Sequence, residues 1–247
     1  MRGKRLLRGA AAVLFWLLLW QLGAMAVNRG LLIAVPTPLR TAAALLRLAG
    51  QKSFWAAVAL SLGRILLGFA AAVVTGVLLA AASSAGRVFE ALGAPLLKTL
   101  RAIPVASFTL LVFLWVPRDR IPTVISFLTV LPVVWSNAEK GLLAMDRQLW
   151  EMGKIMGLSP LKIAREIRWP ALRPYLQAAV TTGLGFAWKS GVAAEVICRT
   201  GSSLGNWLWL EKNAVDYEGV FAVTAVIVLL SVALESVVRL ALKGEGA

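Results

Sequence analysis

Residues 146–174 read DRQLWEMGKIMGLSPLKIAREIRWPALRP, and this polar stretch lies between long apolar runs. Nine of its 29 residues are charged, so it cannot lie in the hydrocarbon of a membrane. Asp146 and Ser159 are residue types that start helices, and Gly157 is the type that ends one in a left-handed conformation. Pro170 is expected to end the second helix. The stretch therefore predicts a helix-turn-helix held outside the membrane.

The first helix of this stretch is expected to carry an apolar ridge. Leu149, Met152 and Met156 recur at the three- and four-residue spacing that places side chains on one helical face. A ridge of this kind on a charged segment suits contact with a partner protein.

The composition is that of an integral membrane protein. Hydrophobic residues make up 59% of the chain, charged residues only 15%, and the mean hydropathy is +0.78; a soluble domain has about 25% charged residues. In a soluble protein the net charge of +14 would suggest nucleic acid. Here it is read as membrane orientation, and no nucleic-acid partner is expected.

Several chemical functions are not expected of this chain. Cys198 is the sole cysteine and histidine is absent, so neither an internal disulfide nor a zinc site is predicted. No G-x-x-x-x-G-K-[ST] stretch occurs, so the chain is not expected to bind ATP phosphates in the P-loop manner. We therefore predict no catalytic residues, cofactor or metal, and an energy source in another protein.

Six apolar runs are candidates for membrane-spanning helices. They are residues 10–27, 54–82, 103–116, 121–138, 175–197 and 219–240. The first begins like a signal peptide, but it is long and lacks a clear cleavage site, so an uncleaved anchor is expected. Gly63, Gly68 and Gly76 predict close helix contact in the second run. The third is short, and Pro132 predicts a kink in the fourth.

These runs divide the chain into three parts. Residues 1–53 form an anchor helix and an external amphipathic segment, in which Thr37 and Pro38 resemble a helix start. Residues 54–240 form the core, which contains the loop 146–173. Residues 241–247 are a short tail.

The distribution of basic residues predicts the orientation. With the amino terminus in the cytoplasm, 16 of the 26 lysines and arginines lie in cytoplasmic segments and 8 in external ones. The positive-inside rule then places both termini and residues 146–173 in the cytoplasm of a multi-pass protein.

The loop resembles the EAA loop of binding-protein-dependent ABC importer permeases. Glu151, Gly157, Ile167 and Pro170 reproduce the spacing of that motif, while Met152 and Gly153 stand where the family favours two alanines. The resemblance implies that these four residues couple the permease to an ATPase. On the residues alone, Glu151 could instead pair with Arg147 or Lys154 on a solvated helix, worth a few tenths of a kcal/mol.

The resemblance covers roughly residues 34–240. SLGRILLGF at 61–69, LRAIP at 100–104, GFAWKSGVAAE at 185–195 and GSSLGNWLW at 201–209 resemble the branch that handles nitrate, sulfonates and taurine. It implies the type I importer fold with six transmembrane helices and cytoplasmic coupling helices, in a bacterial inner or plasma membrane. The partners it implies are ABC ATPase subunits, an extracellular substrate-binding protein and a second permease copy. The substrate would be a small solute such as nitrate, a sulfonate or taurine; the branch covers anions, zwitterions and heterocyclic precursors, and the basic residues in the spans favour an anion.

Three charges inside the predicted spans are candidates for the translocation pathway. They are Arg64, Lys189 and Glu195. The simpler interpretation is a structural salt bridge between Glu195 and one of the two cations. The alternative is that a cation lines the pathway and attracts an anionic substrate.

Two other functions stay open at this point. An ion-coupled secondary transporter would use the same buried charges, but it predicts inverted repeats that we do not find. A membrane scaffold without transport activity would use the loop only for docking.

Overall fold

The computed structural model describes residues 2–28, 35–144 and 147–244. Over these ranges the chain is helical and contains no strand, which confirms the all-α prediction. The predicted cap Asp146 lies outside the described residues. The helical segments are α1 (Arg2–Val27), α2 (Pro38–Ala49), α3 (Lys52–Ala85), α4 (Arg87–Ala102), α5 (Val105–Phe113), the 3-10 turn η1 (Arg118–Arg120), α6 (Ile121–Leu143), α7 (Arg147–Ile155), α8 (Pro160–Ile163), the π-helical turn η2 (Ala164–Arg168), α9 (Trp169–Cys198), α10 (Leu204–Asn213) and α11 (Tyr217–Gly244).

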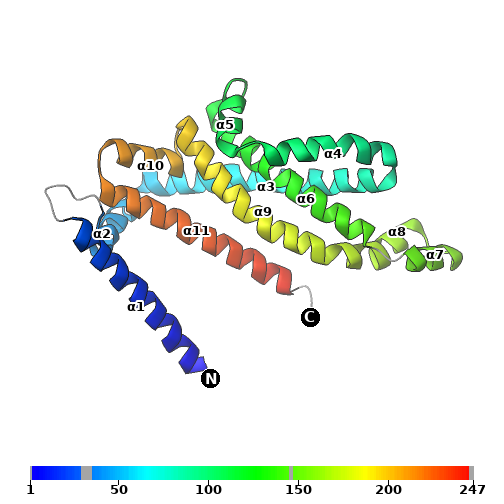
Figure 1. The fold of residues 1–247 in the computed structure, drawn as a ribbon, viewed down its shortest axis with the longest axis horizontal. Helices are drawn as coiled ribbons and strands as arrows, with labels where there is room; N and C mark the ends of the chain where they lie inside the picture. Colours follow the sequence, from blue (N-terminus) through cyan, green and yellow to red (C-terminus); the bar gives the residue numbers. More distant parts are fainter. Residues whose placement is uncertain (1, 29–34, 145–146, 245–247) are drawn as a thin grey trace.

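The centre of the molecule is the crossing of α3, α6 and α9 (Figure 1). Glycines let the helices approach closely. A Cβ atom on Gly68 would lie 2.2 Å from the carbonyl oxygen of Thr123, and one on Gly76 would lie 2.9 Å from Val134. The close contact predicted at these two glycines is confirmed, whereas Gly63 faces open space.

Three helical segments are long and apolar enough to cross a membrane. They are Lys52–Ser84, Arg118–Leu143 and Tyr217–Leu242. The apolar part of α1, Ala11–Val27, is shorter. Helix α9 has 30 residues but also carries charges within the predicted span. The protein is thus membrane-embedded, and the count of six spans remains a prediction.

The third predicted span, residues 103–116, is wrong as a continuous helix. Only Val105–Phe113 forms α5, which at 1.5 Å per residue is about 14 Å long, against about 30 Å of hydrocarbon. Ala91–Ala102 of α4 and α5 pass the test for a span only together, and they meet at an angle of 102°. The break falls at Pro104, because a residue before proline is forced into an extended conformation, here Ile103.

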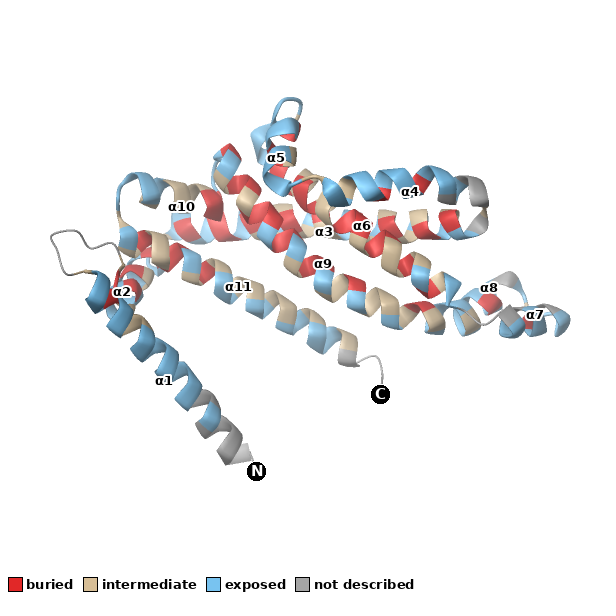
Figure 2. Ribbon diagram, viewed as in Figure 1, coloured by how far each residue is buried: buried red, intermediate tan, exposed pale blue. Residues whose placement is uncertain are grey.

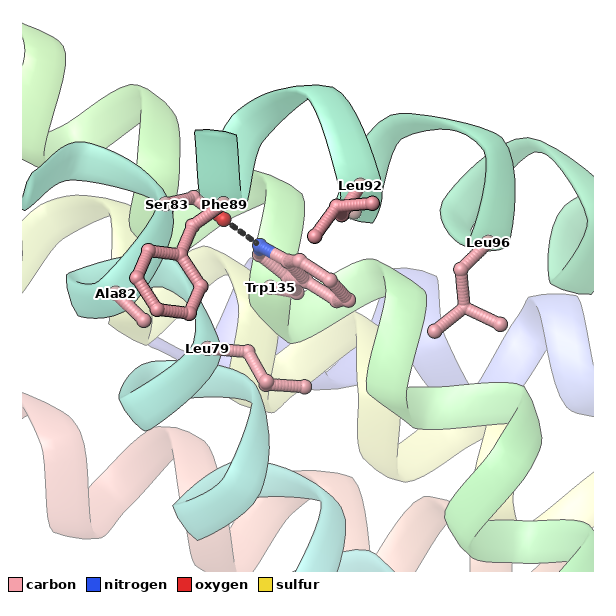
Figure 3. A pocket seen from close by; sticks show the side chains of 8 residues that line it. Leu79, Ala82, Ser83, Phe89, Leu92, Leu96 and Trp135 are labelled. Atoms are coloured by element: carbon pink, nitrogen blue, oxygen red, sulfur yellow. Dashed lines mark hydrogen bonds between the residues drawn. The ribbon is translucent and has the colours of Figure 1, made fainter. Parts of the chain in front are cut away.

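Helix α4 packs against α3 and α6 around the side chain of Trp135. The Trp135 indole of α6 donates a hydrogen bond of 3.1 Å to Ser83 Oγ of α3 (Figure 3). It lies where a side chain on Gly93 of α4 would be, because a Cβ there would be 2.5 Å from the indole ring. An apolar cavity of about 190 Å³ remains beside the ring. This packing brings the first half of α4 against α3 and α6.

The two ends of the molecule are built differently. Helices α2 and α10 lie at one end and α7 and α8 at the other (Figure 1). Thr37 caps α2 as predicted, accepting from the Arg40 backbone nitrogen. Arg47 of α2 then pairs with Asp216 at 2.7 Å, and Arg40 pairs with Glu218 at 3.6 Å. These ion pairs tie α2 to the start of α11.

Candidate functional site

The predicted helix-turn-helix is present as α7 and α8, called here the hairpin (residues 147–170). Gly157 adopts a φ of +69°, and Leu158 N donates to Gly153 O at 3.0 Å, which together end α7 in a Schellman turn. Ser159 Oγ accepts from Lys162 N at 3.4 Å and caps the next helix. The predicted turn at Gly157 and the cap at Ser159 are therefore confirmed.

The two arms of the hairpin close on Gly153. A Cβ on this residue would lie 3.1 Å from Ile167 and 3.4 Å from Ile163, so a larger side chain would push the arms apart. Ile163 is buried and Ile167 is half-buried. The sequence comparison noted Gly153 only as a departure from alanine, and the structure shows why a small residue is needed.

Pro170 does not end the second helix, so that prediction is wrong. The chain passes from α8 through the π-helical turn Ala164–Arg168 directly into α9. A proline inside a helix removes one backbone hydrogen bond and crowds the carbonyl four residues earlier, which here belongs to Glu166. A π-helical turn relieves this conflict with its wider bonding ring. The hairpin is consequently continuous with α9.

The other arm of the hairpin follows α6. Near the hairpin, Gly141 of α6 meets α9 so closely that a Cβ would lie 2.9 Å from Leu172 and 3.1 Å from Tyr175. Movement of the hairpin would therefore reach both α6 and α9 at this crossing.

Much of the described part of the hairpin is exposed (Figure 2), and several of its exposed side chains are apolar. Leu149, Met152 and Met156 are 51%, 56% and 71% exposed, so the predicted ridge is present. Ile155 at 85% and Leu161 at 80% extend it. Glu151 is also exposed on α7. Apolar side chains gathered on a polar segment indicate a binding surface.

Glu195 is fully buried and does not form the predicted salt bridge. Its Oε2 accepts from Ser61 Oγ at 2.8 Å and from Gly205 N at 3.1 Å. Ser61 Oγ in turn accepts from Leu204 N at 2.9 Å. The carboxylate thus binds the first turn of α10 to α3, and its Oε1 has no hydrogen-bond partner in the described ranges.

Arg64 joins two turns at the same end of the molecule. Its guanidinium donates to the Ser202 carbonyl at 3.0 Å and pairs with Asp119 at 3.4 Å. Asp119 lies in η1 between α5 and α6, and Ser202 lies between α9 and α10. These contacts place the Arg64 guanidinium beside the turns at this end of the molecule rather than at the middle of the span.

Lys189 differs from both of these residues. It is exposed on α9, although its neighbours Trp188 and Ser190 are buried. Trp188 donates to the Ile227 carbonyl of α11 at 3.0 Å, so that side of α9 packs inside the molecule. Lys189 therefore projects from the uncovered face of α9.

Sequence reasoning did not identify Ser61, Asp119 or Gly205 as the partners of the intramembrane charges. Ser61 and Gly205 lie 134 and 10 residues from Glu195, and Asp119 lies 55 residues from Arg64. The sequence did offer one indication: Ser61 and Gly205 lie in the motifs at 61–69 and 201–209, and Asp119 lies in the short connection between two predicted spans.

Comparisons with known proteins agree with this geometry. Residues 72–243, more than half of the chain, match the family described as binding-protein-dependent transport system inner membrane component. The nitrate import permease of Synechocystis sp. is 27% identical over 158 residues, which is 62% of this chain and 56% of that protein. The taurine transport system permease of Escherichia coli is 25% identical over 207 residues, 81% of this chain and 75% of that one.

A solved structure has the same fold. An amino acid ABC transporter chain matches with a TM-score of 0.65 at 15% identity, covering 81% of this chain and 97% of its own length.

Proposed function

Because the chain belongs to the family of binding-protein-dependent transport system inner membrane components, we propose that it couples ATP hydrolysis in a partner to transport. The hairpin docks on an ABC ATPase subunit, and an external binding protein delivers the solute. Closure of the ATPases moves α6 and α9, and the spans switch between inward and outward opening.

The observation that carries this proposal is the hairpin itself. It presents an apolar ridge to a partner, Gly153 holds its arms together, and it continues without interruption into α9. A scaffold needs only the ridge. The rigid connection to α9 and the crossing at Gly141 suit a lever that transmits movement.

We also propose the orientation and the assembly. The hairpin and both termini lie in the cytoplasm, as the excess of basic residues on that side favours. A second copy of the chain completes the pathway between two subunits. The ion-paired end formed by α2, α10 and α11 then faces the binding protein.

The solute is a small anion in this proposal. The two relatives named above carry nitrate and taurine in their names. Of the three charges considered, Lys189 is the one proposed to line the pathway, because an exposed cation within a span needs a water-filled cavity or a partner. Arg64 and Glu195 already have structural partners.

Co-purification tests the docking. Glu151→Lys and Gly157→Asp should each reduce recovery of the ATPase with the permease, while Glu166→Lys, a matched charge reversal on η2, should reduce it much less. Equal recovery with all three variants would contradict the docking surface.

Uptake into proteoliposomes tests the energy source. The intact transporter with its binding protein should accumulate labelled nitrate or taurine when ATP is supplied inside the vesicle lumen that holds the ATPase. Uptake that needs a proton gradient and continues without the ATPase would favour a secondary transporter instead. Lys189→Glu should lower the ATP-driven uptake of an anion.

A further inference from the structure

A second arginine, Arg101, contacts a residue nearer the middle of a predicted span than Arg64 does. Arg101 is in the last turn of α4, just before the break at Pro104, and its Nη2 donates to the Pro132 carbonyl at 3.1 Å and to Ser136 Oγ. Pro132 lies near the middle of the apolar segment Arg118–Leu143. The guanidinium is therefore held close to half the depth of that span.

This charge is not balanced within the chain as it is described. Arg40, Arg47 and Arg64 each pair with a carboxylate, whereas Arg101 pairs with none of the described acidic residues. Arg101 is also exposed. An arginine at this depth is costly in contact with lipid, so an uncovered, unpaired one marks a place where water or an anion reaches the span.

The neighbouring face of α6 is polar. Thr129 and Ser136 are seven residues apart, two helical turns, and so lie on the same face as the arginine contact. Val130 and Val134 are fully buried on other faces, against α9 and α3 respectively. The hydroxyl face is only half-buried, which leaves it open beside the end of α4.

We propose that Arg101, with Ser136 beside it, forms an anion-binding step in the middle of the translocation pathway. Its ligand is a small oxyanion such as a nitrate, carboxylate or sulfonate group. Two N–H bonds of the guanidinium are used by Pro132 and Ser136, and those on Nε and Nη1 have no acceptor among the described residues. Charge-assisted bonds from these donors suit oxyanion oxygens.

This anion-binding step rests on the proposed transport function, and the structure indicates where along the pathway it would lie. Ser126 of α6 donates a hydrogen bond to the Ala187 carbonyl of α9, and Val130 of α6 packs against Gly183 of α9. The two helices therefore run in opposite directions, and positions further along α6 lie beside earlier positions on α9. Pro132 is consequently level with the part of α9 that precedes Lys189 by about two turns, roughly 10 Å at 1.5 Å per residue. An anion would meet Lys189 first and Arg101 further in.

Cysteine labelling tests the step without requiring a transport cycle. Cys198, the sole cysteine, is replaced by alanine, and Thr129→Cys is introduced as a reporter on the face next to Arg101. Membranes that contain the full transporter are treated with an anionic sulfonate-type or a cationic ammonium-type methanethiosulfonate reagent. The measured quantity is the ratio of the two labelling rates.

We expect both reagents to reach the reporter and the anionic one to be favoured. Arg101→Gln should lower the ratio roughly fivefold to tenfold, because one charge acts on the two reagents in opposite directions. Arg101→Lys should keep most of the ratio. Arg239→Gln, which removes an exposed arginine on α11, should leave it unchanged.

Two results would overturn the step. If neither reagent labels the reporter, the face is not water-filled. If labelling is unchanged by Arg101→Gln, or by Arg101→Met where the glutamine variant is not inserted, the arginine only supports the backbone at Pro132. Failure of the ATPase to co-purify would instead contradict the proposed function and leave the labelling ratio intact.

Discussion

We call the end that carries α2 and α10 the outer end. It differs from the hairpin end in where its polar and apolar side chains find partners. At the outer end, Glu195 and Arg64 bind backbone and side-chain groups from several turns, and Arg47 joins α2 to α11. At the other end, the hairpin arms meet at the contacts around Gly153, and the hairpin's apolar ridge is uncovered.

This difference separates a part that is complete within one chain from a part that is not. The two hydrogen bonds that the buried Glu195 carboxylate accepts come from its own chain, so the outer end is joined by contacts within one copy. The hairpin exposes Ile155 and Leu161 almost fully, and those side chains gain burial only against a partner. Substitutions at the outer end should therefore affect stability, and those in the hairpin should affect assembly.

The largest effect is expected at Glu195. Glu195→Ala removes the acceptor for Ser61 and for Gly205 N, and a buried donor left without a partner costs about 1–3 kcal/mol, so the pair costs about 2–6 kcal/mol. Thermal unfolding of the purified permease in detergent measures the loss. Glu195→Gln retains an acceptor oxygen and should lose less. An alanine variant as stable as the wild type would contradict the claim that the carboxylate holds α10.

The next effect is expected where the hairpin arms meet. Gly153→Leu inserts a side chain against Ile163 and Ile167, and overpacking of this kind costs about 1–3 kcal/mol. The hairpin contributes little to the packing of the membrane-spanning helices. We therefore expect roughly a tenfold loss of bound ATPase and of uptake, with the thermal stability of the permease nearly unchanged.

Met152→Leu is the matched control. It changes an exposed residue on the adjacent position and keeps the volume, so it should alter ATPase binding only slightly. If Gly153→Leu lowered thermal stability as much as Glu195→Ala, the distinction between the two ends would fail.

The sequence predicted these two ends unequally. Hairpin features depend on neighbours in the chain, so Gly157 and Ser159 could be assigned from local helix rules. Pro170 was misassigned because the rule that proline ends a helix does not account for a π-helical turn. The burial of Gly153 could not be predicted in this way, because it depends on how the two arms pack against each other.

The partners of the intramembrane charges could not be predicted, because they depend on how distant segments meet. The sequence favoured a salt bridge of Glu195 with Arg64 or Lys189, whereas the structure gives Arg64 the partner Asp119 and gives Glu195 the partner Ser61. That α4 and α5 pass the test for a span only together was not predicted for a related reason: hydropathy measures length and apolarity, and it does not report the angle of 102° between them.

A smaller effect is expected at the turn of the hairpin. Gly157→Val places a β-branched residue at a φ of +69°, and the left-handed conformation costs about 1–2 kcal/mol per residue with a Cβ. The ATPase recovered with the permease should fall severalfold. Gly157→Asn should retain more, since asparagine tolerates this conformation.

Gly63→Ala is the control for the loss of a glycine as such. Gly63 lies in α3 with open space around the added methyl group, so its change should leave both stability and ATPase recovery close to the wild type. A similar effect from Gly63→Ala and Gly157→Val would show that the left-handed turn is unimportant.

The smallest effect is expected in the outer junction, where pH acts on two carboxyls in opposite directions. Burial raises the pKa of Glu211 above its ordinary 4.5, and the neighbouring negative charge of Asp216 raises it further. For Asp216, the hydrogen bond from Gly219 N lowers the pKa below its ordinary 3.8, and Arg47 also lowers it. Glu211 is thus destabilising when ionised, and Asp216 is stabilising when ionised.

Because the two pKa values shift in opposite directions, the two carboxyls affect stability in different pH ranges. As the pH falls through the raised pKa of Glu211 toward 4.5, protonation removes the cost of burying its charge and its repulsion with Asp216, and the junction gains stability. Asp216 contributes fully above 3.8, and its contribution is lost as the pH falls through its lowered pKa. Both contributions should be below about 1 kcal/mol, because partly exposed charges are screened. Glu211→Gln should abolish the gain and leave the loss, as measured by the difference in thermal unfolding between variant and wild type from neutral pH to pH 3. A variant that retained the gain would assign it to another carboxyl, and the outer end would then be less tightly organised around Asp216 than its ion pair with Arg47 indicates.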